Sequence, residues 1–238
     1  MFYLRNKVAI VAGGTSHIGR GIVYTLLKAG AEVVVPSRSI TNIESLQKFC
    51  PSDSRDRLIP VMVDLTNESQ TASFASFIFK EYHQIDILVS GICCSWQGES
   101  LTSVQSEIWD RVFLKTSLAN FTIVRHIVPM LDVNHGIYFH LNRQSADLPQ
   151  AFSGLSAMSA AAQKAMVCTL SEELRDVGIR CYEIITGNIR PCIIMQEEDR
   201  THYCPMEIGM YLMDLVLQRK ESDQVIHRLI SRTERQIA

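Results

Sequence analysis

Short apolar runs alternate with longer amphipathic segments along the chain. The short runs have the length and β-branched content of buried strands, whereas the longer segments repeat apolar residues at the spacing of one helix face. The pattern predicts seven strands, at Val8–Ala12, Glu32–Val35, Leu58–Val63, Ile85–Val89, Ile137–Leu141, Ile179–Ile185 and Val225–Ile230. It predicts helices between them, at Ser16–Gly30, Asn42–Phe49, Glu68–Tyr82, Val104–Leu131, Ser153–Val177 and Met206–Leu217.

Strands that alternate with helices predict an α/β fold, a doubly wound parallel Rossmann sheet of about seven strands with helices on both faces. Right-handed crossovers wind the strands outward from the first, so a ligand crevice is expected at their carboxyl ends, where the winding direction changes. The 238 residues contain no Pro/Gly-rich linker and no internal repeat. We therefore expect one domain covering residues 1–238.

Composition and charge exclude several classes of protein. Hydrophobic residues make up 47% of the chain and charged residues 20%, with a net charge of −2 and no basic stripe, so nucleic acid is not an expected partner. No apolar stretch reaches the roughly 18 to 20 residues that span a bilayer. The seven cysteines lack disulfide or zinc spacing, and His202 with Cys204 is an incomplete ligand pair, so no metal site is expected. Together these features predict a cytoplasmic protein without a membrane partner.

The segment VAIVAGGTSHIGRG places a turn of small residues between the first strand and the first helix. Glycines there let the backbone approach a pyrophosphate, and the helix N-terminus offers oriented N–H groups. A glycine-rich turn also occurs for purely structural reasons, and this alternative stays open. The candidate binding residues in the turn are Gly13, Thr15, Ser16, Ile18 and Gly19.

Further segments follow in a recognisable order. The loop spacing resembles the T-G-x-x-x-G-I-G pattern of the short-chain dehydrogenase/reductase family, IDILVSG stands where that family has D-I-L-V-N-N-A-G, and IWDRVFLKTSLANF resembles W-D-x-V-x-x-V-N. The resemblance extends through SEELRDVGIRCYEIITGNI and so covers nearly the whole chain. It adds five candidate cofactor-binding residues, Ser37, Arg38, Asp64, Leu65 and Gly91.

The resemblance implies NADP(H) as the cofactor. Arg38 stands where the family commonly has a basic residue for the 2′-phosphate, and Asp64 resembles the family's adenine-contacting aspartate. Two plainer interpretations remain, with Arg38 a solvated loop charge and Asp64 an ordinary helix cap. Retained, weak and absent NADP(H) binding therefore all stay open.

The family's catalytic positions hold other residues in this chain. Aligning SAMSAAAQKA with S-A-Y-S-A-S-K-A-A places Met158 at the tyrosine and Ala162 at the lysine. Thr116 takes the place of the asparagine on the fourth helix, and Asn142 with Arg143 stands where the serines belong. Thioether and methyl groups cannot transfer a proton. The chain is therefore expected to be a degenerate member with no catalytic residue of the family's kind.

Nearby polar residues do not simply replace the missing ones. Lys164 lies about 200° around the helix from the lysine position, and Asn120 lies one turn beyond the asparagine position. Ser145 follows the end of the fifth strand, and His140 is expected to pack against a helix rather than face the crevice. His17 replaces a loop glycine, so its imidazole must either swing outward or crowd the phosphate path.

Three functions remain in view. The leading hypothesis is a non-redox binding or regulatory protein, a pseudoenzyme that keeps part of an NADP(H)-type adenosine pocket. The first alternative is an NADP(H)-dependent oxidoreductase that uses substitute acids such as Ser145, His140 or Tyr203. The second is a lyase, isomerase or cyclase that uses the crevice to orient a small-molecule ligand. A homo-oligomer, dimer or tetramer, is expected through the fourth and fifth helices, because small residues at Ala157–Ala165 permit close approach.

Overall fold

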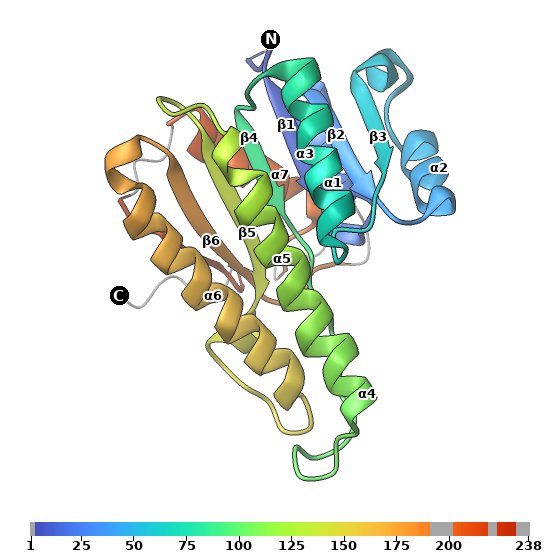
Figure 1. Cartoon of the computed structure of the whole chain (residues 1–238), viewed down its shortest axis with the longest axis vertical. Coiled ribbons are helices and arrows are strands. Elements are labelled where there is room, and N and C mark those ends of the chain that lie inside the picture. The colour runs from blue at the N-terminus through green and yellow to red at the C-terminus, as the bar shows by residue number, and fades with distance from the viewer. Residues whose placement is uncertain (1–2, 191–201, 219–222, 232–238) are drawn as a thin grey trace.

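The computed structural model describes residues 3–190, 202–218 and 223–231. Its strands form one sheet in the order β3-β2-β1-β4-β5-β6-β7, with every neighbouring pair parallel (Figure 1). The predicted doubly wound α/β fold is therefore confirmed. The strands are β1 (Val8–Ala12), β2 (Glu32–Ser37), β3 (Leu58–Met62), β4 (Ile87–Ser90), β5 (Ile137–Arg143), β6 (Arg180–Thr186) and β7 (Ile226–Leu229).

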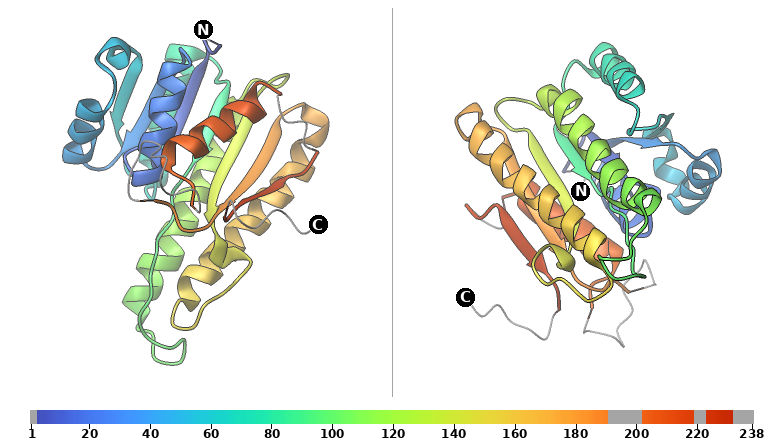
Figure 2. Two further views of the ribbon diagram at one scale, coloured as in Figure 1. Left: turned by 180° about the vertical axis from the view of Figure 1, so that it is seen from behind. Right: turned by 60° about the horizontal axis from the view of Figure 1, so that its bottom comes forward.

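Helices cover both faces of the sheet. They are α1 (His17–Lys28), α2 (Ile40–Phe49), α3 (Glu68–Tyr82), α4 (Ser106–Trp109), α5 (Lys115–His126), α6 (Gly154–Leu174) and α7 (Pro205–Val216). Helices α3, α5 and α6 pack on one face, and α1 with α7 packs on the other, as the two opposite views show (Figures 1 and 2). The strands are buried between two apolar clusters, which is why their sequences are continuous apolar runs.

The predicted fourth helix is divided into several segments. It begins two residues later than expected, and a π-helical turn at Asp110–Leu114 separates α4 from α5. The rings of Trp109, at the end of α4, and Phe113, in the π-turn, stack with centroids 4.4 Å apart. The helix ends before Leu131, because Pro129 lacks the N–H that would continue it, and a short 3₁₀ turn follows at Val128–Met130. Such π-turns often occur at functional sites.

Two strands are longer than predicted. Strand β2 continues to Ser37, which pairs with Met62, and β5 continues to Arg143, which pairs with Thr186. The residues at these ends are polar, so the hydrophobic pattern did not indicate that the strands continue there. The extension places Ser37 and Arg143 at the carboxyl edge of the sheet. The structure also has a 3₁₀ segment at Ser52–Arg57 that the sequence did not predict.

Candidate functional site

A cavity of about 530 Å³ opens at the carboxyl ends of the central strands. This volume is in the range of small-molecule and cofactor sites. Of the ten predicted cofactor-binding residues, the structure places six in its lining, namely Gly13, Thr15, Ser37, Arg38, Asp64 and Leu65. The lining also includes Asn42, Arg111 and Lys115, which the sequence did not predict.

The other four predicted residues shape the cavity without lining it. Ser16 caps α1, since its Oγ accepts the Gly19 N–H at 3.1 Å, and the Ile18 side chain packs against the core. A Cβ on Gly19 would lie 2.1 Å from the Gly13 carbonyl oxygen, and one on Gly13, whose φ is +81°, would lie 2.8 Å from the Gly91 oxygen. The glycines therefore let the turn, the helix and the end of β4 approach closely.

The cavity carries excess positive charge. Asp64 Oδ1 accepts hydrogen bonds from Thr66 N–H at 2.9 Å and Thr66 Oγ1 at 2.7 Å. Burial of this carboxyl opposes its ionisation, but those hydrogen bonds and the nearby charges of Arg38 and Lys115 outweigh burial and lower the pKa of Asp64. Within the described residues no ion pair or hydrogen bond neutralises Arg38, Arg111 or Lys115. The site therefore favours an anionic ligand.

Asp64 is not the cap of the following helix. Asn67 occupies that position, and its Oδ1 accepts the Gln70 N–H at 3.1 Å. Asp64 instead holds the turn before α3, and its side chain is oriented by Thr66 at the cavity wall. The alternative interpretation of Asp64 as an ordinary helix cap was therefore wrong.

The structure places Met158 and Ala162 on the solvent-accessible side of α6, and neither lines the large cavity. Met158 is 41% exposed, and Ala162 is exposed as well. The buried side of this part of the helix is formed by Ser156, Ala160 and Gln163. Ser156 Oγ fixes this orientation by accepting a hydrogen bond from the Trp96 N–H at 2.7 Å, and residues two positions later point about 200° away.

Shifting the alignment does not restore the family's pair. Helix α6 contains no tyrosine, and its one lysine, Lys164, forms an ion pair with Asp147 at 2.6 Å. Thr116 is buried and lines the large cavity. Asn120, one turn further on, is fully buried and instead joins β4 to α6, since it accepts from Ser90 Oγ at 2.6 Å and donates to Gln163 Oε1 at 3.0 Å.

His140 belongs to a buried polar network below the crevice. Its Nδ1 lies 2.7 Å from Glu183 Oε2, and its Nε2 lies 3.0 Å from Gln163 Oε1. An amide oxygen can only accept hydrogen bonds, so His140 Nε2 must be the donor to Gln163 Oε1. The same oxygen also accepts from Asn120 Nδ2. Asn142 Nδ2 donates to the other Glu183 oxygen at 2.5 Å. Both imidazole nitrogens are bonded and His140 has no exposed surface, so the expected packing role is supported and a substitute-acid role is not.

Ser145 lies in the lining of a second, smaller cavity. This cavity of about 90 Å³ is formed at the ends of β5 and β6, with Arg143, Ser145, Thr186 and Asn188 in its wall. The Arg143 guanidinium lies beside the Cys93 thiol, which lines the larger cavity. The two cavities are therefore neighbours along the carboxyl edge of the sheet.

His17 is turned away from the large cavity. Its Nε2 lies 2.7 Å from the backbone carbonyl oxygen of Arg190, in the segment after β6. Arg190 is buried and bonded to Glu207 Oε2 at 3.0 Å, so this contact joins the start of α1 to the start of α7. Tyr203 packs beside this segment and lines neither cavity, which leaves its proposed acid role without geometric support.

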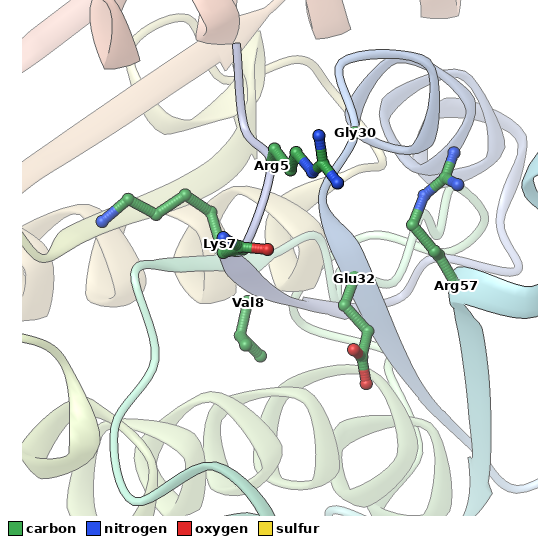
Figure 3. Close-up of a pocket in the computed structure, with 7 residues that line it drawn as sticks. Arg5, Lys7, Val8, Gly30, Glu32 and Arg57 are labelled. Carbon is green, nitrogen blue, oxygen red and sulfur yellow. The ribbon is translucent and has the colours of Figure 1, made fainter. Parts of the chain in front are cut away.

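A separate cavity of about 490 Å³ lies at the amino ends of the strands (Figure 3). Two of its charged side chains already have partners within the protein. Lys7 Nζ contacts Asp86 Oδ1 at 2.7 Å, and Glu32 accepts a hydrogen bond from the Tyr82 hydroxyl. Ligand crevices of doubly wound sheets open at the carboxyl ends instead, so this cavity is not part of the candidate site.

Two kinds of feature are absent from the described part of the chain. No helix there is both long and apolar enough to cross a membrane. No group of three or more histidine, cysteine or acidic side chains lies close enough to hold a metal ion among those residues. The candidate site therefore consists of the large cavity, the small cavity and the residues that join them.

The fold and the position of the crevice define a doubly wound α/β protein with a cofactor-sized cavity at the switch point of its sheet. The family model for short chain dehydrogenases matches residues 7–202. The chain therefore belongs to the short-chain dehydrogenase family. That membership defines its general class as oxidoreductase-like.

Individual relatives agree with this assignment. An uncharacterized oxidoreductase of Staphylococcus saprophyticus is 26% identical over 192 residues, covering 79% of this chain and 81% of the relative. Farnesol dehydrogenase of Aedes aegypti is 26% identical over 205 residues, covering 80% and 78%. The crystal structure of a metagenomic short-chain oxidoreductase in complex with NADP superposes with a TM-score of 0.79 at 20% identity, covering 95% of this chain and 98% of that one. The structural likeness supports the fold alone.

Proposed function

We propose that the large cavity binds NADP(H) and that the chain is an NADP(H)-dependent oxidoreductase that uses substitute residues. The observation that carries the proposal is the meeting of the glycine turn, Arg38 and Asp64 in one cofactor-sized cavity. A planar guanidinium binds phosphate oxygens through paired hydrogen bonds, and it suits the 2′-phosphate that distinguishes NADP(H). NADP is bound in two solved structures with the same fold, the metagenomic oxidoreductase and ElxO.

The redox part of the proposal rests on the neighbouring small cavity. When bound, NADPH would supply a hydride, and the chain must then hold and polarise the substrate beside it. Ser145 has a hydroxyl in the small cavity, and Arg143 places a guanidinium beside the larger one. Of the three substitute acids considered, Ser145 is therefore the one with a place at the site.

A non-redox binding or regulatory protein is the second candidate. It is favoured by helix α6, which has no tyrosine and whose only lysine is held by Asp147. Loss of a general acid costs about 10² to 10⁴ in rate. Such a pseudoenzyme would keep nucleotide binding and lose turnover.

Nucleotide titration followed by an NADPH oxidation assay on a mixture of carbonyl compounds tests these functions. Saturable binding with turnover that falls in Ser145→Ala supports the proposal. Binding without turnover favours the non-redox protein. A folded chain that binds neither NADPH nor NADH contradicts both, and leaves the lyase, isomerase or cyclase hypothesis.

Arg38→Ala is expected to weaken NADPH binding about 10- to 100-fold while changing NADH affinity little. A hydrogen bond to a charged group contributes about 1.5–3 kcal/mol, and only NADPH carries the 2′-phosphate. Calorimetric titration of both nucleotides measures the effect. Arg175→Ala is the matched control, because Arg175 is an exposed arginine far along the chain at the end of α6. Equal losses of affinity for NADPH and NADH would show that Arg38 does not contact the 2′-phosphate.

Saturating NADP⁺ is expected to slow alkylation of Cys93 by iodoacetamide. Cys93 is exposed and lines the large cavity, so an occupying nucleotide covers its thiol. Cys168 is the internal control, because it is partly exposed and lies in a different surface hollow. Peptide mapping by mass spectrometry gives both rates. Equal rates at Cys93 with and without nucleotide would place the ligand elsewhere.

The homo-oligomer also remains a proposal, supported by apolar side chains on the outer faces of α5 and α6. Leu118 is 42% exposed, Phe121 is 51% exposed and Met158 is 41% exposed. The two helices lie side by side on one face of the molecule (Figure 1). A second copy would bury this surface.

Phe121→Glu is expected to convert that oligomer to a monomer, because a charge would be buried at the contact. Light scattering at micromolar concentration measures the mass of the parent and variant. Phe79→Glu is the control, since Phe79 is an exposed aromatic residue on another helix, α3. A monomeric parent chain would refute the oligomer.

A further inference from the structure

The small cavity combines a cationic side chain with polar neutral ones. Besides Arg143 and Ser145 its wall contains Gln144, Thr186 and Asn188. Its volume of about 90 Å³ holds a small organic group but not a nucleotide. Strand β5 places Arg143 at its last position, and the chain then turns through a short 3₁₀ segment that positions Ser145.

The charge of Arg143 is not neutralised by a carboxylate of the chain. The acidic residue of the same loop, Asp147, is already held by Lys164 Nζ at 2.6 Å and by Arg228 Nε at 2.7 Å. Burial disfavours the Asp147 carboxylate, but these two hydrogen bonds prevail and lower the pKa of Asp147. The Arg143 guanidinium instead lies beside the Cys93 thiol, whose pKa is raised by burial.

Ser145 provides a second, independent observation. Its Oγ is buried and has no hydrogen-bond partner within the described residues. A buried hydroxyl without a partner costs about 1–3 kcal/mol, so a ligand that accepts its hydrogen bond would recover that cost. The neighbouring Thr186 hydroxyl does not fill the role, because it donates to the Asn142 carbonyl oxygen at 3.0 Å.

We propose that Arg143 and Ser145 form a binding subsite for the carboxylate group of a small organic acid. A guanidinium and a hydroxyl together supply donors for both oxygens of a carboxylate, and the small volume suits a planar group better than a phosphate ester. Arg143 also lies beside Cys93, which lines the large cavity. The inference rests on the proposed function in one respect, since it names the substrate class of the same crevice as carboxylate-bearing carbonyl or hydroxy compounds.

Pyruvate and its uncharged ester methyl pyruvate are the probes for the test. Each is titrated in the absence of nucleotide and followed by ligand-observed NMR. Pyruvate is expected to bind with a dissociation constant in the millimolar range, and methyl pyruvate about tenfold more weakly because it lacks the charge. Equal binding of the two, no detectable pyruvate binding, or tighter binding of inorganic phosphate would overturn the carboxylate assignment.

Variants then locate the binding. Arg143→Gln is expected to weaken pyruvate binding about 10- to 100-fold, and Ser145→Ala about 2- to 10-fold. Arg175→Gln is the matched control, since it removes an exposed arginine that lines neither cavity. Unchanged pyruvate affinity in Arg143→Gln, or an equal loss in Arg175→Gln, would refute the subsite.

The same samples separate this inference from the proposed function. NADP⁺ binding is measured on each variant by calorimetry. Pyruvate binding that depends on Arg143, in a chain that binds no NADP⁺, would keep the subsite and refute the cofactor proposal. NADP⁺ binding that depends on Arg38, together with absence of pyruvate binding, would keep the cofactor proposal and refute the subsite.

Discussion

Replacing Glu183 with glutamine is expected to lower the free energy of unfolding by about 3 kcal/mol. The Glu183 carboxylate accepts hydrogen bonds from His140 Nδ1 and Asn142 Nδ2 with no exposure to water. His140 also bonds Gln163 through Nε2, so both imidazole nitrogens are held in this network. Glutamine keeps the shape but turns one of the two accepting oxygens into an N–H₂ donor, and each buried polar group left without its partner costs about 1–3 kcal/mol.

Urea denaturation of parent and variant measures this difference. Glu172→Gln is the matched control, because Glu172 makes an exposed ion pair with Arg175 on the same protein. Exposed pairs contribute about 0–1 kcal/mol, so the control is expected to change stability little. A loss below about 1 kcal/mol in Glu183→Gln would show that the buried network tolerates an amide at this position, and would contradict its role in holding β5 to β6.

The fold followed from the sequence because its strands are buried on both faces. Such strands are continuous apolar runs, and apolar residues in the helices between them repeat every 3.6 residues, so the type and order of the elements could both be predicted. The ends of the elements were harder to predict. Ser37 and Arg143 extend their strands through backbone pairing with a neighbour, which their polar side chains do not indicate.

The two halves of the candidate site differed in how far the sequence revealed them. The glycine turn, Arg38 and Asp64 could be predicted because each belongs to a short local motif. The structure places Gly13, Arg38 and Asp64 in the lining of one cavity. The orientation of α6 is not evident from the sequence, because alanine and serine occur on both of its faces from Ala157 to Ala165, so no apolar stripe indicates the buried side.

Other site residues depend on contacts that are distant in sequence. Arg111 and Lys115 reach the cavity from a helix that contains a π-turn, and an ordinary helical repeat does not predict that turn. Their spacing of four residues was a usable signal that they share one helix face. Glu183 lies 43 positions from His140, so only the pairing of β5 with β6 brings the two side chains together.

Gly19→Ala is expected to destabilise the chain by about 3 kcal/mol and to weaken NADP⁺ binding about 100-fold. The added Cβ would lie 2.1 Å from the Gly13 carbonyl oxygen and 2.7 Å from the Gly14 Cα. Both are backbone atoms, so no side-chain rotation relieves the overlap and the turn itself must move. Overpacking of this kind costs about 1–3 kcal/mol, and displaced N–H donors lose charged hydrogen bonds of about 1.5–3 kcal/mol each.

Gly98→Ala is the control for the glycine turn. Its added Cβ would meet only the ring of Trp96, at 3.0 Å, and a side chain can adjust where a backbone cannot. Thermal unfolding and calorimetric titration on both variants measure stability and affinity separately, with circular dichroism to establish that each sample is folded. A stable Gly19→Ala chain with parent-like NADP⁺ affinity would show that the turn accommodates a side chain and does not hold the nucleotide. Loss of affinity in a variant that stays folded, with Gly98→Ala unchanged, would locate the phosphate contact at the turn that joins β1 to α1.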